Sequence, residues 1–189
     1  MKTANPSPYP KPIKIAASSA ITLWWLWGPL LLITSIDPLT RLFAGKPIVE
    51  PTLTSLASVL TLPLVGIALT LLYRRRGITL TPQQLEVVST FYRKQIPLNN
   101  LRLDRARVVN FDEYPEFKPG AKSNGFQLPG FRSGHFRTAE GGKGFCLITD
   151  NHRVLILPLR DGSVVMVSPD KPRALLDALN QLADNRNRA

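Results

Sequence analysis

Residues 147–179 read LITDNHRVLILPLRDGSVVMVSPDKPRALLDAL, and this stretch decides the fold that we expect. Two runs rich in Val, Ile and Leu are separated by Asp161-Gly162, which is among the strongest signals of a tight hairpin turn. After Ser168 the period changes to that of one helix face. The leucines that carry this period are Leu175, Leu176, Leu179 and Leu182. The stretch therefore predicts strands followed by one amphipathic helix, which must cover an apolar surface.

Further strand-like segments lie upstream. Between residues 131 and 168, four segments alternate with turn residues, and we interpret them as an antiparallel meander. They are FRSGHFRT, KGFCLIT, HRVLILPL and SVVMVS. GITLT, QLEVVST and FYRKQIPL lie between residues 77 and 98 and are enriched in β-branched and aromatic residues. A helical turn at Asn99-Asn100 and a strand near 103–109 complete a prediction of about seven short strands.

The segment 125–136, GFQLPGFRSGHF, combines glycines, aromatic residues and basic residues. No strand-to-helix step follows it, so we do not expect the helix N-terminus that forms a phosphate site. Gly125 and Gly130 would permit positive φ or a close chain approach, and Pro129 would fix a turn. The side chains expected to pin a crossing loop to the sheet are Phe126, Leu128 and Phe131. The residues that remain for binding a partner are Arg132, His135 and Arg137.

Two stretches near the N-terminus, 15–36 and 51–73, carry no charged residue. Each is long enough for a helix that crosses a bilayer core, which needs about 20 apolar residues. Pro29 and Pro63 would be tolerated better in a membrane helix than in a soluble one. We therefore expect a two-span transmembrane hairpin over residues 15–73, after a tail at residues 1–14.

Two alternatives compete with this interpretation. The stretches could be buried helices of a soluble core, but neither carries the polar stripe usual there. Residues 1–44 could be a cleaved signal peptide, since Lys2, Lys11 and Lys14 make the start basic. The apolar run is too long for a typical signal, however, and no small-x-small site follows it.

Basic residues near the span ends predict the orientation. Three lysines precede the first stretch and the arginines at 74–76 follow the second, whereas the intervening loop, 37–50, holds only Arg41 and Lys46. We therefore expect both termini in the cytoplasm. From Arg74 onward, 19 Lys or Arg stand against 11 Asp or Glu. Such a basic domain would lie against the anionic inner leaflet, and no motif suggests nucleic acid as its partner.

No residue pattern proposes an enzyme. The only histidines, His135 and His152, and the single cysteine, Cys146, do not provide the three or four close ligands of a metal site. The acidic group Asp112, Glu113 and Glu116 lies in a segment with Pro115 and Pro119, which suggest an exposed loop. There is no nucleophile elbow, phosphate loop or dinucleotide turn. We expect no catalytic residue, no metal and no cofactor, and we interpret Cys146 as a small core residue.

Residues 77–182 resemble the bacterial pleckstrin-homology (PH) domain family, in a membrane-anchored form with two N-terminal transmembrane helices. The resemblance rests on ITLTPQQLEV, RKQIPLNNLR, NGFQLPGFRSGHFR and LITDNHRVLILPLRDGSVVMVSPDKPRALLDAL. It implies a mainly-β domain at 77–184: about seven antiparallel strands in a bent sandwich closed by a C-terminal α-helix, with a polar tail at 185–189. It does not imply an enzyme. Together with the two apolar stretches, it leads us to expect a multi-pass protein of the bacterial inner membrane.

The resemblance does not imply phosphoinositide binding. Phosphoinositide-binding members carry basic residues in the first hairpin, but the corresponding turn here is Thr81-Pro82-Gln83-Gln84. Two functions stay open. The domain could be an interaction module for a protein partner or for self-association at the inner leaflet. Alternatively, it could be a sensor or regulator that binds an anionic lipid or a small anionic ligand through its basic residues.

Overall fold

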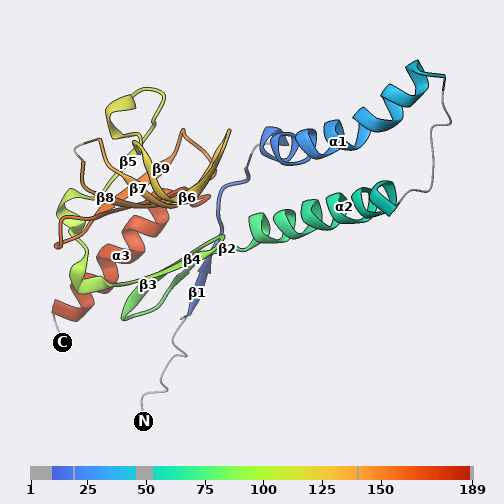
Figure 1. The fold of residues 1–189 in the computed structure, drawn as a ribbon. Coiled ribbons are helices and arrows are strands. Elements are labelled where there is room, and N and C mark those ends of the chain that lie inside the picture. The colour runs from blue at the N-terminus through green and yellow to red at the C-terminus, as the bar shows by residue number, and fades with distance from the viewer. Residues whose placement is uncertain (1–9, 19, 46–52, 140, 188–189) are drawn as a thin grey trace, which may run out of the picture. The chain divides into compact units, whose positions relative to one another are not determined.

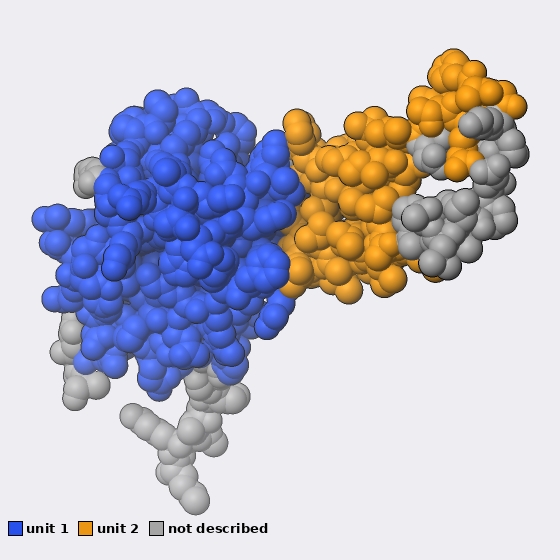
Figure 2. Space-filling model, viewed as in Figure 1, with its two compact units in different colours: residues 1–18, 75–189 blue, residues 19–74 orange. Residues whose placement is uncertain are grey.

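The computed structural model of the chain describes residues 10–18, 20–45, 53–139 and 141–187, without the side chains of Asp37 and 53–59. The chain divides into two compact units. One unit comprises residues 1–18 and 75–189, and the other comprises residues 19–74 (Figure 2). Residues 10–14, the described part of the expected tail at 1–14, therefore belong to the first unit.

The helical unit consists of α1 (Ala20–Phe43) and α2 (Leu53–Arg74) (Figure 1). Among the described residues, α1 is long and apolar enough to cross a membrane. Leu60–Arg74 of α2 is also apolar but shorter than a span. Two spans thus remain a prediction. The expected loop at 37–50 is wrong in its first half, because α1 continues through Pro38 to Phe43. Lys46 lies outside the described residues.

The two helices pack through Trp27 of α1 and Gly66 of α2. A Cβ atom at Gly66 would lie 2.7 Å from the Trp27 ring, so only glycine leaves room for it. The Trp27 indole N–H donates to Thr70 Oγ1 at 3.1 Å, and Thr70 in turn donates to the Gly66 carbonyl at 2.7 Å. Small residues and interhelical hydrogen bonds hold helices together where the surroundings are apolar. This contact explains why a tryptophan lies in the body of α1 and away from its ends.

The first sheet of the other unit has the order β1-β2-β3-β4, with all neighbours antiparallel. Its strands are β1 (Lys11–Ile13), β2 (Arg76–Leu80), β3 (Gln84–Ser89) and β4 (Tyr92–Pro97). The expectation of a tail at 1–14 is wrong for residues 11–13, because they form β1. The first helix also begins at Ala20 and not at residue 15. The short sequence of β1, KPI, shows no alternation long enough to identify a strand.

The chain continues from β1 onto the second sheet. Ile15 forms a bridge with Pro169, and the Ala16 N–H donates to the Ser168 carbonyl at 2.9 Å. The buried Thr149 hydroxyl donates to the Ala16 carbonyl at 2.8 Å. The segment just before α1 therefore joins both sheets.

The second sheet has the order β5-β9-β10-β8-β7-β6. Its strands are β5 (Arg107–Val109), β6 (Lys122–Leu128), β7 (Phe131–Arg137), β8 (Lys143–Ile148), β9 (Val154–Pro158) and β10 (Val164–Val167). The described residues thus form ten strands where about seven were expected. The crossing loop expected at 125–131 is instead a hairpin of β6 and β7.

The expected meander is wrong for the last three strands. β10 lies between β8 and β9 and runs parallel to β8, so β8 and β9 are not neighbours. The connection after β8 is too long for a tight hairpin and closes over the end of β10. There the Ser168 hydroxyl donates to the Asp150 carbonyl at 2.9 Å, and the Ser168 N–H donates to the Leu147 carbonyl at 3.0 Å.

Both faces of the second sheet are covered. The face with Ser133 and Phe145 lies toward the first sheet, since Ser89 and Lys94 contact these residues. The opposite face forms a separate cluster around Phe136, Cys146 and Met166. The loop between β5 and β6 covers this cluster with Phe111 and Phe117.

The C-terminal helix α3 (Pro172–Asn187) is amphipathic, as the leucine spacing predicts. Leu175 and Leu179 are buried, and the helix contacts β9 and the short 3-10 turns Leu98–Asn100 and Leu103–Arg105. The first of these turns agrees with the helical turn expected at Asn99-Asn100. The helix extends to Asn187, so the first half of the polar tail expected at 185–189 is helical, while residues 188–189 lie outside the described residues.

Candidate functional site

The β6–β7 hairpin carries all the residues that the sequence proposed for binding. Pro129 and Gly130 form its two-residue turn, and Gly130 has a φ of +74°, which glycine adopts without a steric penalty. Phe131 is buried, and its ring lies 6.1 Å from that of Phe126. Both phenylalanines therefore belong to the strands of the hairpin.

Gly125 and Gly134 oppose each other across the hairpin. A Cβ atom at Gly125 would lie 2.6 Å from the Ser133 carbonyl oxygen. A Cβ atom at Gly134 would lie 2.7 Å from the Tyr92 ring. The Tyr92 hydroxyl donates to Asn124 Oδ1 at 2.5 Å. Gly134 thus admits the Tyr92 ring, which joins β4 to the second sheet, while Gly125 permits the close approach of the β7 backbone.

The structure does not bring Arg132, His135 and Arg137 together. Successive side chains of a strand point to opposite faces of its sheet. Arg132 is half-buried and is paired in register with Ile148, a member of the Phe136 cluster. His135 is on the other face, where its ring lies 5.2 Å from the rings of Tyr92 and Phe145. His135 is exposed apart from these ring contacts, and its role in binding stays a prediction.

Arg132 lines an open surface pocket of about 410 Å³ at the tip of the hairpin. Lys122 supplies a second cation there, and Gln127 and Asn151 supply amide groups. Within the described part of the chain, neither Lys122 nor Arg132 has an ion-pair partner. This pocket therefore has the charge and the donors to hold a small anion. The sequence analysis proposed Arg132 for binding but could not show that Lys122 lines the same pocket.

Arg137 is exposed beside a different cation. It is paired in register with Lys143 of β8, so two like charges lie directly opposite each other. Lys94 lies on the same face, over the Phe145 ring at 5.8 Å. Burial lowers the pKa of Lys94, and the nearby Asp161 carboxylate opposes that shift. This basic surface is separated from the pocket by the sheet.

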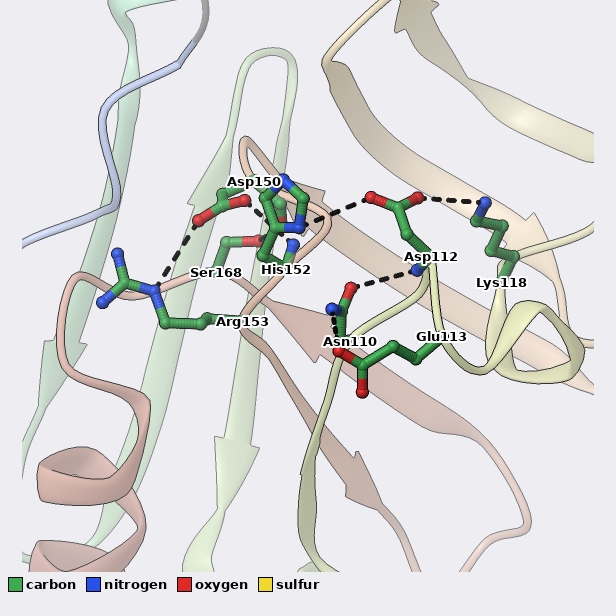
Figure 3. A network of polar contacts seen from close by, with 8 residues as sticks. All are labelled: Asn110, Asp112, Glu113, Lys118, Asp150, His152, Arg153 and Ser168. Atoms are coloured by element: carbon green, nitrogen blue, oxygen red, sulfur yellow. Dashed lines mark hydrogen bonds and ion pairs between the residues drawn. The ribbon is translucent and has the colours of Figure 1, made fainter.

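The acidic loop is tied to its surroundings by a polar network (Figure 3). Asp112 pairs with Lys118 at 3.3 Å and with His152 Nδ1 at 3.5 Å. Asn110 donates to Glu113 and accepts from the Asp112 N–H. These contacts hold the loop that carries Phe111 and Phe117 over the cluster around Phe136. The carboxylates of Asp112 and Glu113 therefore have a structural role.

The neighbouring hydroxyl does not complete a catalytic arrangement. Ser168 donates to the Asp150 carbonyl and not to His152 (Figure 3). Among the residues whose placement is described, no group of three His, Cys, Asp or Glu side chains could hold a metal ion.

The turn between β3 and β4 lies where the sequence separated QLEVVST from FYRKQIPL, but its backbone conformation and its exposed ring were not expected. Thr90 has a φ of +53° and is the non-glycine residue with positive φ within the described ranges. It is buried, whereas the adjacent Phe91 is 58% exposed. The Ser89-Thr90 pair does interrupt an apolar run in the sequence, but nothing there marks Phe91 as exposed.

Comparison with known families and structures agrees with this fold. The family model described as "Bacterial PH domain" matches residues 76–183, which is more than half of the chain. Neither a curated protein nor a solved structure gives a significant match. The matched range includes β2 to β10 and most of α3, that is, the two-sheet domain without β1. The chain therefore belongs to the bacterial PH domain family.

Proposed function

We propose that this protein is a non-enzymatic integral membrane protein, and that its PH domain is a cytoplasmic interaction module for a protein partner or a second copy. Membrane anchoring is supported by one observation: the segments just before and just after the helical unit belong to the same domain. Residues 11–13 and 76–80 pair as β1 and β2 of one sheet. Arg76 also donates to the Ser18 hydroxyl at 3.2 Å.

This pairing constrains the topology. The chain leaves the domain after residue 18 and returns to it at residue 75, so the segment between them begins and ends on the same side of a bilayer. If α1 crosses, the rest of the segment must cross back, and α2 is the helix available for it. The arginines at 74–76 favour the cytoplasm for that side.

The topology is tested with accessibility tags. A tag after Gly45 should be reached from the periplasm, and a tag at Ala189 should be reached only from the cytoplasm. A tag at Ala189 that is reached from the periplasm would contradict the proposed orientation. Extraction of the protein by alkaline carbonate would contradict the integral anchoring itself.

The open edge of β6 is the surface that best suits a protein partner. β6 pairs with β7 on one side, and with seven residues it is the longest edge strand of the two sheets. β5 and β1 have three residues each, and β1 contains Pro12, which has no N–H to donate. A free edge binds an extended segment through main-chain hydrogen bonds.

The interaction is tested by photo-crosslinking in cells. A crosslinker at Gln127 on β6 should yield a discrete product, with twice the mass if the partner is a second copy. The matched control is a crosslinker at Asp177, which is equally exposed but on α3. A lysine at Ser123 should reduce the product, because charged side chains discourage edge pairing. Equal products at both positions would contradict the assignment.

The pocket at the hairpin tip supports the second candidate, a sensor for an anionic ligand. Titration of the purified full chain with inorganic phosphate should give saturable binding that Arg132→Glu abolishes. Arg137→Glu, on the other face, should leave it unchanged. Equal weakening by both variants would indicate nonspecific attraction and exclude the pocket.

A further inference from the structure

The turn between β3 and β4 is next to the point where the chain emerges from α2. The Thr90 N–H donates to the Arg75 carbonyl at 2.9 Å, and Arg75 directly follows Arg74, the last residue of α2. Ser89 is paired in register with Arg76. The turn therefore lies at the end of the domain to which the helices are attached.

Phe91 is displayed at this turn and is not packed into the core. Its side chain is 58% exposed, the highest value for an aromatic residue among the described part of the domain, where Tyr114 reaches 50%. Its described ring contact is with Tyr92, edge to face at 6.5 Å. Arg75, whose carbonyl accepts the Thr90 N–H, is exposed as well. An exposed apolar ring and an exposed arginine at one turn match the composition of a membrane interface.

The backbone holds Phe91 in this position at some cost. Thr90 is β-branched, and a positive φ is strongly disfavoured for such a residue. Its hydroxyl accepts a hydrogen bond from Ser133 Oγ at 2.8 Å, and Ser133 also contacts Ser89 Oγ at 2.8 Å. All three hydroxyl residues are buried. The turn cannot relax to hide Phe91 without breaking these bonds, and strain retained in this way often marks a functional position.

We propose that the β3–β4 turn is a membrane contact: Phe91 enters the interfacial layer of the leaflet at which α2 ends, while Arg75 binds a lipid phosphate. The inference rests on the proposed anchoring by α1 and α2. It goes beyond anchoring, because it assigns a second, peripheral contact to the domain itself. That contact would restrict how the domain presents its β6 edge.

The test uses the full chain in vesicles of phosphatidylcholine and phosphatidylglycerol. A fluorescent probe is attached to Phe91→Cys, and quenching is measured with lipids that carry a spin label high on the acyl chain. The matched control is Tyr114→Cys, which replaces the other well-exposed aromatic residue, in the loop between β5 and β6. The native Cys146 is fully buried, so a labelling ratio of one probe per chain also shows that each variant is folded.

We expect quenching at position 91 to be several-fold stronger than at position 114, and Arg75→Gln to reduce it. Equal quenching at the two positions would overturn the inference while leaving the anchoring intact. Shielding of position 91 from aqueous iodide without quenching by lipid would also overturn it, in favour of a protein contact. Failure of the full chain to float with the vesicles would refute the anchoring and the contact together.

Discussion

Gly134 combines two constraints that no other residue type meets. Its φ is +105°, and a Cβ atom would lie 2.7 Å from the Tyr92 ring and 2.8 Å from Gly125 Cα. Gly125 Cα belongs to the backbone, so it cannot move away without distorting β6. The packing of β4 against the second sheet thus depends on a single missing methyl group.

Gly134→Ala should therefore lower the free energy of unfolding by about 3 kcal/mol, from backbone strain and overpacking. The measurement is chemical denaturation of the full chain in detergent. Gly77→Ala is the control, because Gly77 is also in a strand but a Cβ atom there meets nothing within 4 Å. A similar loss in both variants would mean that strand glycines matter in general and that the Tyr92 contact does not.

Cys146 provides a prediction on pH. Burial raises the pKa of its thiol to about 12. Because the folded pKa lies above the unfolded one, this contribution is fully present below about pH 8.5 and is lost as the pH rises towards 12. Stability should fall by about 1.4 kcal/mol per pH unit from this group above pH 9. Cys146→Ala should be less stable at neutral pH but should have a shallower alkaline slope, and equal slopes would refute the assignment.

At the scale of elements, the placement of β10 shows what local patterns leave open. Residues 143–167 contain three apolar segments joined by turn residues, and every local signal is compatible with two successive hairpins. The parallel pairing of β10 with β8 depends instead on Ser168, which bonds to the backbone at both Leu147 and Asp150. A single serine far along the sequence thus helps to select the strand order.

The helix pair offers a test of its own. Replacing Trp27 by Phe and Thr70 by Val removes the two ends of the interhelical hydrogen bond. A double-mutant cycle should give a coupling of about 0.6 kcal/mol, which is typical of such bonds in membrane proteins. Unfolding in mixed micelles provides the measurement. Thr34→Val is the control partner, because Thr34 donates to the carbonyls of Leu30 and Leu31 within its own helix. Coupling of Trp27 to Thr34 would contradict the specific contact.

At the scale of the whole molecule, the domain is discontinuous in sequence. Residues 10–18 contribute β1, the bridge of Ile15 to Pro169, and the backbone bond from the Asp170 N–H to the Lys14 carbonyl at 2.9 Å. The matched family range begins only at residue 76. A domain cut at that boundary would expose one edge of β2 and would leave Thr149 without its acceptor.

We therefore expect a chain in which a short Gly/Ser linker replaces residues 19–74 to be more stable than residues 75–189 alone. The lost backbone pairs predict a difference of at least about 2 kcal/mol, at roughly 1 kcal/mol for each net hydrogen bond. Thermal and urea denaturation of the two soluble proteins would measure it. Equal stability would show that the N-terminal segment binds the domain without stabilising it.

Elements whose signals are local can be predicted from the amino-acid sequence alone. The leucine spacing of α3, the Asp161-Gly162 turn, the turn at Pro129-Gly130 and the two apolar stretches all depend on residues close together in the chain. The resemblance to the bacterial PH domain family rested on such segments and agrees with the matched family model.

Contacts between segments that are far apart in the chain could be seen only in the tertiary structure. It separated Arg132 from Arg137 by the thickness of a sheet, brought Lys122 to Arg132, and placed β1 beside β2 across the helical unit. It also set Phe91 next to Arg75 through one backbone hydrogen bond. These contacts join residues that are 10 to 69 positions apart in the chain. Their choice depends on how two sheets and a helix share buried surface, and a short sequence window carries no information about that competition.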